Sequence, residues 1–275
     1  MRLFGVIGSP INHSLSPAMH SAALKSLKID AVYSPFEVPP AHLKPMLRAL
    51  VLAGVEGLNV TVPLKERVKF LCDRLDPAAR AIGAVNTLVI RNRKLVGYNT
   101  DAAGFLKAIE AIGWRSQPSH VAVLGAGGAA RSVVWALSGT RGVSITIANR
   151  HLAAAKRLAR ESKRWHPGAV VTGVSLDRLK LEDVDWLINA TTIGMQARDP
   201  SPIALGKLHR HTRVFDLIYH RQTRLIKEAR RRGCVASGGL SMLLYQGAAS
   251  LQLWTRRKPP VQVMRHALCA AILNR

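Results

Sequence analysis

Acidic residues are scarce in this chain of 275 residues, where 16 Asp and Glu stand against 40 Lys and Arg and the formal net charge is +24 at pH 7. Such an excess of positive charge is compatible with binding to nucleic acids or anionic membranes, but it also attracts small anionic ligands. Aromatic residues make up only 5% of the chain, and no RNP-type or zinc-finger pattern is present. We therefore expect no specific nucleic-acid partner.

Cysteines and long apolar runs are also few. Cys72, Cys234 and Cys269 are odd in number and lack CxxC spacing, which predicts reduced thiols and neither a disulfide framework nor a metal site. No apolar run approaches the roughly 18 residues that a membrane-spanning helix needs. The opening segment Met1–Gly8 predicts a β-strand and not a signal peptide. We expect a cytoplasmic protein without a metal or membrane partner, either a monomer or a homodimer.

Strand and helix patterns alternate along most of the chain. Short apolar segments alternate with helical stretches such as Ala18–Leu27 and His42–Leu52, which predicts βαβ units and a largely parallel sheet. After Gly238 the pattern changes to two helices without an intervening strand, Leu240–Trp254 and Pro260–Leu273. The predicted strands are Leu3–Ile7, Val32–Phe36, Leu58–Val62, Thr87–Ile90, Val121–Leu124, Ser144–Ala148, Val170–Val174, Trp186–Asn189 and Val214–Leu217. We predict a two-domain α/β fold.

A glycine-rich turn follows the predicted strand Val121–Leu124 and opens a predicted helix from about Gly128 to Leu137. Its residues Gly125-Ala-Gly-Gly-Ala-Ala130 fit the GxGxxA pattern of dinucleotide-binding folds. Gly125 allows the tight turn, Gly127 allows the backbone to approach a pyrophosphate, and Ala130 allows the helix to pack closely on the strand. The pattern predicts a nucleotide site. A glycine-rich turn without a ligand is the alternative.

The end of the next predicted strand bears on the choice of dinucleotide. An NAD site usually has a carboxylate there, about 20 residues after the first glycine, to bind the ribose hydroxyls. This chain has Asn149 and Arg150 instead. A guanidinium group can bind the 2′-phosphate of NADP, which a carboxylate would repel. The sequence therefore favours NADP.

Seven further motifs occur in an order and spacing that are together highly specific. The chain resembles the shikimate dehydrogenase family over nearly its full length. The motifs that carry this resemblance are Ser9–His20, Gly57–Lys65, Gly83–Thr87, Gly97–Gly104, Asn189–Met195, Asp216–Tyr219 and Met242–Ala248.

The resemblance implies an NADP-dependent oxidoreductase that interconverts 3-dehydroshikimate and shikimate in the biosynthesis of chorismate and aromatic amino acids. It also implies the domain organisation. Residues 1–101 would form an α/β substrate-binding and catalytic domain, residues 102–238 a Rossmann-type NADP-binding domain, and residues 239–275 helices that return to the first domain.

The resemblance assigns Lys65 and Asp101 as the catalytic pair, with Lys65 as the proton donor to the developing alkoxide and Asp101 as its orienting partner. Shikimate carries one carboxylate and three hydroxyls, for which hydroxyl, amide and carboxylate side chains are suitable partners. The implied substrate residues are Ser14, Ser16, Asn59, Thr61, Asn86, Tyr219 and Gln246. The implied cofactor residues are Gly125, Ala126, Gly127, Gly128, Ala129, Ala130, Asn149, Arg150, His151, Thr191, Leu217, Gly239 and Met242.

The chain departs from the family pattern next to the expected 2′-phosphate site. His151 replaces a usual threonine, and Ala154 stands where a second arginine is common, so Lys156 or Arg157 would have to supply any further charge. A quinate/shikimate dehydrogenase with broader substrate or NAD use is therefore the alternative within the family. A catalytically silent nucleotide-binding regulator and a polyanion-binding protein are the alternatives from other classes. Ser16 and Arg150 favour the shikimate-specific, NADP-using branch.

Overall fold

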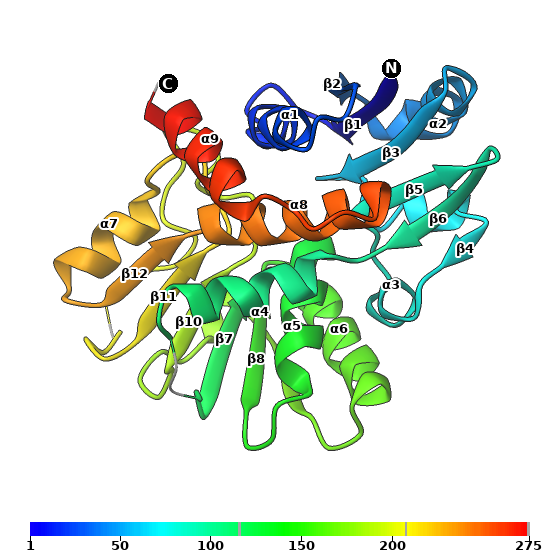
Figure 1. Cartoon of the computed structure of the whole chain (residues 1–275). Helices are drawn as coiled ribbons and strands as arrows, with labels where there is room; N and C mark the ends of the chain where they lie inside the picture. The colour runs from blue at the N-terminus through cyan, green and yellow to red at the C-terminus, as the bar shows by residue number, and fades with distance from the viewer. Residues whose placement is uncertain (115–116, 207, 274–275) are drawn as a thin grey trace. The chain divides into compact units, whose positions relative to one another are not determined.

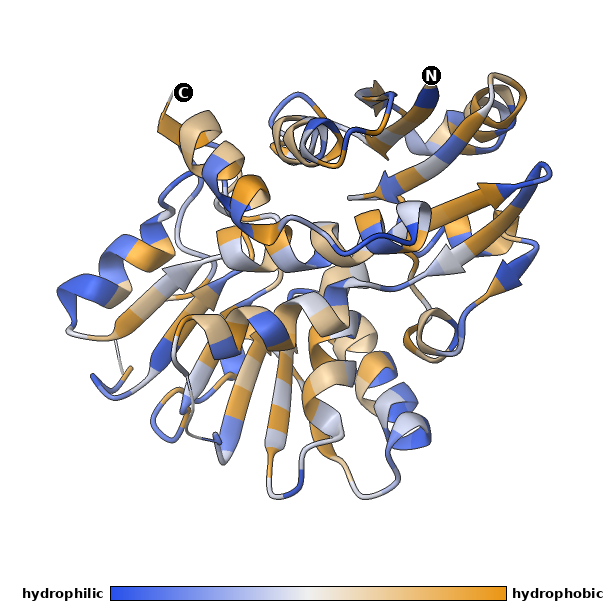
Figure 2. Ribbon diagram, in the orientation of Figure 1, coloured by the Kyte–Doolittle hydropathy of each residue, from blue (hydrophilic) through white to orange (hydrophobic). Residues whose placement is uncertain are grey.

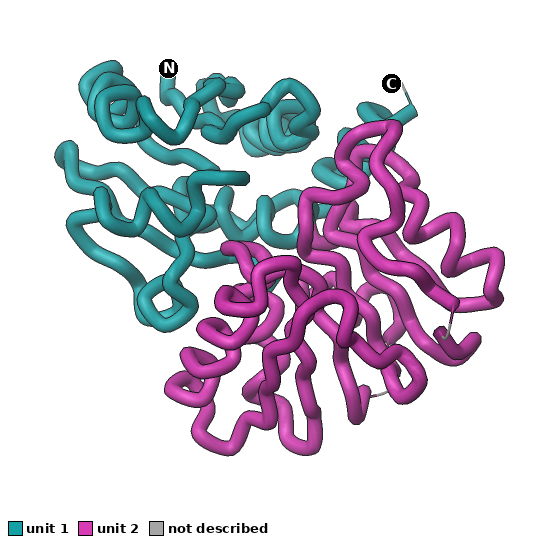
Figure 3. Tube along the Cα trace, turned by 180° about the vertical axis from the view of Figure 1, so that it is seen from behind, with its two compact units in different colours: residues 1–104, 243–275 teal, residues 105–242 magenta. Residues whose placement is uncertain are grey.

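The computed structural model describes residues 1–114, 117–206 and 208–273. The chain divides into two compact units, the first formed by residues 1–104 with 243–275 and the second by residues 105–242 (Figure 3). Each unit contains one six-stranded sheet (Figure 1). None of the described helices is long and apolar enough to span a membrane.

The sheet of the first unit is mixed, in the strand order β2-β1-β3-β5-β6-β4. β1 pairs in parallel with both β2 and β3, and β5 pairs antiparallel with β3 and β6. These strands are β1 (Arg2–Gly8), β2 (Ala31–Glu37), β3 (Val55–Val60), β4 (Arg74–Leu75), β5 (Thr87–Arg91) and β6 (Lys94–Tyr98).

The antiparallel hairpin of β5 and β6 was not among the sequence predictions. Its turn residues Asn92 and Arg93 both have positive φ, 50° and 61°, as a tight two-residue hairpin turn requires. Because Arg93 stands where such turns usually have glycine, the pattern did not predict a hairpin. The predicted strand Leu58–Val62 is also wrong at both ends, since β3 spans Val55–Val60 and the chain enters a series of turns at Thr61.

Helices of the first unit enclose an apolar core that includes Ile7, Leu58, Leu64 and Leu88. α9 packs against α1, and Trp254 of α8 donates a hydrogen bond from Nε1 to the Leu88 carbonyl at 2.9 Å. The predicted return of the C-terminal helices to the first unit is thus confirmed. The helical elements are α1 (Ser16–Ser26), η1 (Pro40–His42), α2 (Leu43–Leu52), η2 (Val68–Leu71), α3 (Pro77–Ile82), α8 (Leu240–Thr255) and α9 (Val261–Leu273).

The sheet of the second unit is entirely parallel, in the order β12-β11-β10-β7-β8-β9. Numbered from β7, this is the 3-2-1-4-5-6 order of a Rossmann fold, with the strand order reversing between β7 and β10. The predicted fold class is confirmed. The strands are β7 (His120–Leu124), β8 (Ser144–Asn149), β9 (Val170–Ser175), β10 (Trp186–Asn189), β11 (Arg213–Asp216) and β12 (Val235–Gly238).

The helices α6 and α7 of the second unit bury apolar residues and leave most of their charged residues exposed. Figure 2 shows this alternation of orange and blue along α6 and α7. The second unit holds most of α4 (Asp101–Ala111), together with α5 (Gly128–Ser138), α6 (Leu152–Trp165), η3 (Leu176–Arg178) and α7 (Arg224–Arg231). Its core includes Leu124, Leu187, Val214 and Leu225.

Candidate functional site

The glycine-rich turn lies at the carboxyl end of β7, where the strand order of the second unit reverses. Gly125 has φ +104°, and a Cβ there would lie 3.0 Å from the Ala190 carbonyl oxygen, so both conformation and space require glycine. α5 begins directly afterwards with Gly127 as its N-cap, a residue that has no side chain to cap the helix. Ala130 is fully buried, as close packing on the strand demands. This end of α5 is suited to bind an anion.

The carboxyl end of β8 presents the cation that was predicted to recognise NADP. The Asn149 side chain donates to the His151 carbonyl at 3.1 Å and fixes the turn, while Arg150 and His151 are exposed. Arg150 forms no ion pair with any described residue. Arg157 approaches Glu161 on its own helix at 3.9 Å. Arg150 is therefore an unpaired cation of the turn itself, and Lys156, which also forms no ion pair with a described residue, lies in the first half of α6.

A buried carboxylate joins the turns that follow β10 and β11. Asp216 accepts hydrogen bonds from the Thr223 hydroxyl at 2.6 Å, from the Asn189 amide at 3.0 Å and from the Ile218 backbone N–H at 3.1 Å. Burial, opposed by these hydrogen bonds, raises the pKa of Asp216 to about 6. Asn189 Oδ1 in turn accepts from the Thr191 hydroxyl at 2.7 Å.

This network brings two predicted cofactor segments into one framework within the second unit. Leu217 follows Asp216 directly, and a Cβ on Gly239 would lie 2.2 Å from the Leu217 carbonyl oxygen. The two chain segments can approach this closely only because position 239 has no side chain. Met242 is buried in the first turn of α8, and Tyr219 is half-buried two residues beyond Leu217.

The predicted catalytic pair is formed within the first unit. Lys65 lies in the turns between β3 and η2, and Asp101 is the first residue of α4. The Lys65 ammonium donates to Asp101 Oδ2 at 2.6 Å, and the two side chains are 13% and 4% exposed. A largely buried lysine paired with a buried carboxylate is a candidate proton donor and acceptor.

Two predicted amide side chains adjoin this pair. Asn86 Nδ2 donates to Asp101 Oδ1 at 2.8 Å and lies 3.2 Å from Gln246 Oε1. The Asp101 carboxylate is thus bonded on one oxygen by Lys65 and on the other by Asn86. Lys65, Asp101, Asn86 and Gln246 form one contiguous set from four separate parts of the sequence.

The other predicted substrate residues have different surroundings. Ser14 and Ser16 occupy the loop before α1, where Ser14 Oγ accepts from the Ser16 backbone N–H at 3.2 Å, and Thr61 is half-buried just after β3. Both polar atoms of Asn59 bond to the protein, Oδ1 to the Tyr33 hydroxyl at 2.8 Å and Nδ2 to the Ser250 hydroxyl at 2.9 Å.

Sequence reasoning missed the buried hydroxyls that connect Asn59 to Asn86. They belong to Thr87, Thr100 and Ser250, all nearly or fully buried. Thr87 and Thr100 lie inside recognised motifs, but nothing in the motifs distinguishes them from neighbouring residues. Ser250 lies in the apolar helix α8 without any pattern around it.

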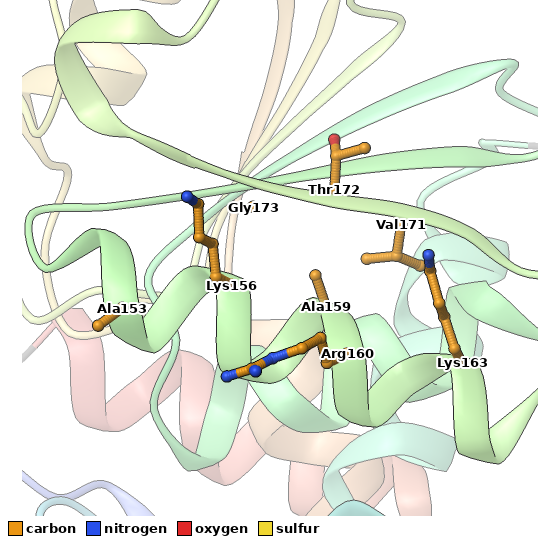
Figure 4. Close-up of a pocket in the computed structure, with 8 residues that line it drawn as sticks. All are labelled: Ala153, Lys156, Ala159, Arg160, Lys163, Val171, Thr172 and Gly173. Atoms are coloured by element: carbon orange, nitrogen blue, oxygen red, sulfur yellow. The ribbon is translucent and has the colours of Figure 1, made fainter.

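A basic groove runs between α6 and the edge strand β9 of the second unit. Lys156 and Lys163 extend from α6 toward β9, while Arg160 lies along the helix (Figure 4). None of these three cations forms an ion pair with a residue in the described part of the chain. The groove is also lined by Ala153, Ala159, Val171, Thr172 and Gly173.

Comparison with known proteins gives matches along most of the chain. Residues 6–88 match the shikimate dehydrogenase substrate-binding domain, residues 108–198 the shikimate/quinate 5-dehydrogenase family, and residues 239–269 the shikimate 5′-dehydrogenase C-terminal domain. The NADP-dependent shikimate dehydrogenase of Methanopyrus kandleri is 43% identical over 272 residues, which cover 96% of this chain and 93% of that protein.

Two solved structures are similar throughout. A shikimate dehydrogenase in complex with NADP+ has a TM-score of 0.90 at 37% identity, with coverage of 99% of this chain and 96% of that one. The shikimate 5-dehydrogenase of Thermus thermophilus, in complex with NADP(H) and shikimate, has a TM-score of 0.86 at 37% identity, with coverage of 98% and 100%. Similarity of this extent and identity establishes that the chain belongs to the shikimate dehydrogenase family.

Proposed function

We propose that this chain catalyses the reversible NADPH-dependent reduction of 3-dehydroshikimate to shikimate, in the route to chorismate and the aromatic amino acids. The observation that carries the proposal is the Lys65–Asp101 contact of 2.6 Å between largely buried side chains. Family membership supports the reaction, and the curated relatives are NADP-dependent shikimate dehydrogenases.

Lys65 and Asp101 divide the proton chemistry between them. When bound, NADPH supplies the hydride that adds to the C3 carbonyl. As negative charge develops on the carbonyl oxygen, Lys65 Nζ donates its proton to that oxygen, and it takes the proton back in the oxidative direction. The Asp101 carboxylate keeps the ammonium oriented and compensates its charge.

The remaining substrate contacts follow the chemistry of shikimate. Ser14 and Ser16 would donate hydroxyl hydrogen bonds to its carboxylate. Thr61, Asn86, Gln246 and Asp101 would bind the ring hydroxyls, and the family resemblance adds Tyr219 to the substrate residues. Asn59 remains one of the proposed substrate-binding residues together with Asn86. Its side-chain oxygen accepts from the Tyr33 hydroxyl, and its side-chain nitrogen donates to Ser250.

The second unit fits NADP by its own geometry. The turn from Gly125 to Ala130, including Ala126, Gly128 and Ala129, has the backbone conformation and the uncapped helix end that a pyrophosphate needs. Arg150, with Asn149 and His151, would bind the 2′-phosphate. Thr191, Leu217, Gly239 and Met242 would line the rest of the cofactor site.

These roles imply a division of labour between the two units. The unit formed by residues 1–104 and 243–275 would bind the substrate, and the unit formed by residues 105–242 would bind the cofactor. These bounds differ by a few residues from the predicted 1–101, 102–238 and 239–275.

The test is an activity assay of the full chain with shikimate or quinate as substrate and NADP or NAD as cofactor. The absorbance of the reduced nicotinamide measures the rate. Shikimate with NADP should be the best pair. Lys65→Ala should lose most of the rate, whereas Lys94→Ala, an exposed lysine in the same unit, should not. Equal rates with quinate or NAD would move the chain to the broader-specificity branch. Folded protein that binds nucleotide but turns over none of these pairs would overturn the proposal.

A further inference from the structure

Three buried hydroxyls form a cluster behind the proposed catalytic pair. They come from Thr87 at the start of β5, Thr100 just before α4, and Ser250 in α8. Thr87 Oγ1 lies 2.7 Å from Ser250 Oγ and 3.2 Å from Thr100 Oγ1, and the Ser250 and Thr100 oxygens are 3.2 Å apart. The exposed fraction is 0% for Thr87 and Ser250 and 5% for Thr100. Because these groups are buried, their hydrogen-bond partners must come from the protein itself.

The direction of each hydrogen bond is assigned from the shortest contacts and from groups that can act in only one way. Ser250 Oγ has a single hydrogen, and we assign it to the Gln246 backbone carbonyl, which lies 3.0 Å away and can only accept. Thr87 must then be the donor across the 2.7 Å contact with Ser250. Having used its own hydrogen, Thr87 accepts from Thr100 at 3.2 Å. Asn86 Oδ1 is equally distant from the Thr100 hydroxyl, but it already accepts the shorter bond from the Thr100 backbone N–H at 2.7 Å.

The same accounting determines the orientation of Asn86. Its Oδ1 accepts from the Thr100 backbone N–H at 2.7 Å, which identifies the oxygen and the nitrogen of the amide. Because Thr100 gives its hydroxyl hydrogen to Thr87, Thr100 Oγ1 accepts from Asn86 Nδ2 at 2.9 Å. The second hydrogen of Nδ2 is then directed at Asp101 Oδ1, 2.8 Å away, which is closer than Gln246 Oε1 at 3.2 Å.

In this series of hydrogen bonds each donor hydrogen is assigned to one acceptor, and all the bonds have the same direction. The sequence of donors starts at Asn86 beside Asp101, passes through Thr100, Thr87 and Ser250, and ends at the Gln246 carbonyl. Asn59 also donates to Ser250 at 2.9 Å, which fills the second acceptor position of that oxygen. The cluster therefore leaves Asn86 as a donor to Asp101, and Asp101 keeps its other oxygen for Lys65.

We propose that Ser250, Thr87 and Thr100 are positioning residues for the Asp101–Lys65 pair, and that Ser250 sets the direction of the whole hydrogen-bond chain. Without the Ser250 hydroxyl, Thr87 Oγ1 and Asn59 Nδ2 lose their partners at 2.7 and 2.9 Å. Thr87 can then turn its hydrogen to Asn86 Oδ1, 3.2 Å away, where it competes with the Thr100 backbone N–H and displaces Asn86 from its position beside Asp101. The carboxylate then loses its fixed partner. This inference rests on the proposed function for its kinetic consequence, but the geometry it describes exists without substrate.

The experiment compares three variants of the full chain: Ser250→Ala, the isosteric Thr87→Val, and Thr87→Ser, which keeps the hydroxyl. For shikimate oxidation, kcat should fall about tenfold in Ser250→Ala and Thr87→Val, as expected when a proton-transfer group is misaligned. The KM for NADP should be unchanged. Thr87→Ser keeps the hydroxyl and should recover most of the rate. The control is Ser162→Ala in α6, a fully buried serine that bonds only to its own helix at 2.8 Å.

A second readout does not depend on turnover. The rate at which a small acylating reagent modifies Lys65, measured by peptide mass spectrometry at one fixed pH, should rise severalfold in Ser250→Ala and Thr87→Val and not in Thr87→Ser or Ser162→Ala. If both kcat and Lys65 modification match the wild type in all variants, the positioning role is wrong although the enzyme activity stands. If the wild type is inactive, the proposed function fails and Lys65 modification alone decides the positioning role. Uniform loss of stability with unchanged kcat per folded molecule would also overturn it.

Discussion

Arg150 is the single residue on which cofactor preference depends most directly. It is exposed at the carboxyl end of β8 and lacks an acidic partner in the described structure, and Ala154 offers no second cation one turn later. We expect Arg150→Ala to raise the KM for NADP by about tenfold or more, since a charge-assisted phosphate contact is lost, and to change the KM for NAD little. Steady-state kinetics with both nucleotides measure this.

The matched control is Arg164→Ala, an exposed arginine in the last turn of α6. It should leave both KM values unchanged. Equal effects of Arg150→Ala on NADP and NAD would mean that Arg150 does not distinguish the two nucleotides, and Lys156 would then be the next residue to test.

At the residue scale, the sequence motifs predicted the catalytic side chains but not the buried residues that hold them in position. Lys65 and Asp101 were predicted as a pair, and they lie in contact. Ser250 could not be predicted, because its partners Thr87 and Asn59 are 163 and 191 residues away along the chain. Hydrogen-bond direction depends on distances that only the folded chain supplies.

Among the elements, β10 and β11 are joined at their carboxyl ends by the buried Asp216. Its pKa is about 6 in the folded protein against 3.8 for the unperturbed group, chiefly because of burial. Between these two pH values the folded state binds more protons than the unfolded state, so this group makes the free energy of unfolding fall as pH rises through the window. The stability of the wild type minus that of Asp216→Asn should therefore decrease from pH 3.8 to about 6.

Urea denaturation at several pH values measures this difference, with the exposed Asp183→Asn as the control for removal of a carboxylate. If the free energies of unfolding of the wild type and Asp216→Asn differ by a constant amount from pH 3.8 to about 6, the raised pKa of Asp216 is contradicted.

The packing of α1 on β2 has the opposite pH dependence. His20 of α1 is fully buried and stacks on Tyr33 with ring centres 4.4 Å apart, and burial, opposed by the neighbouring Asn59, lowers the pKa of His20 from 6.5 to about 3. The unfolded chain takes up this proton near pH 6.5 and the folded chain does not, so stability should fall as pH falls from 6.5 toward 3.

His20→Phe keeps an aromatic ring against Tyr33 and removes the titrating group. We expect the variant to lose less stability than the wild type over this acid range, as measured by thermal unfolding in matched buffers. His42→Gln, an exposed histidine in η1, should behave as the wild type. The same acid sensitivity in His20→Phe would show that other groups dominate.

Element boundaries were predictable where apolar patterns were long and not where they were short. The helices Leu240–Thr255 and Val261–Leu273 were predicted almost residue for residue. β4, with two residues, and β12, a four-residue strand ending in Ser237 and Gly238, were missed because they hold too few apolar residues to form a pattern. β4 is a strand because it pairs with β6, and β12 because it pairs with β11, and neither pairing can be read from the local sequence.

Across the whole molecule, fold class followed from the alternation of strands and helices, but the location of the excess charge did not. Composition alone yields +24 without showing where cations gather. In the structure Lys156, Arg160 and Lys163 line one groove between α6 and β9, and α6 holds two further arginines, Arg157 and Arg164. Clustered cations bind a linear polyanion more tightly than the same number of scattered cations, because adjacent anionic groups can be contacted together.

We therefore expect the protein to bind heparin in a salt-dependent manner, with the groove as the main contact. The triple variant K156E/R160E/K163E should elute at clearly lower salt than K44E/R93E/K258E, which changes the net charge equally at three separated exposed positions. Because the two variants carry the same total charge, a difference between them reports the location of binding and not the overall field. Equal elution of the two variants would assign the affinity to net charge alone, and elution of the wild type independent of salt would remove the polyanion affinity altogether.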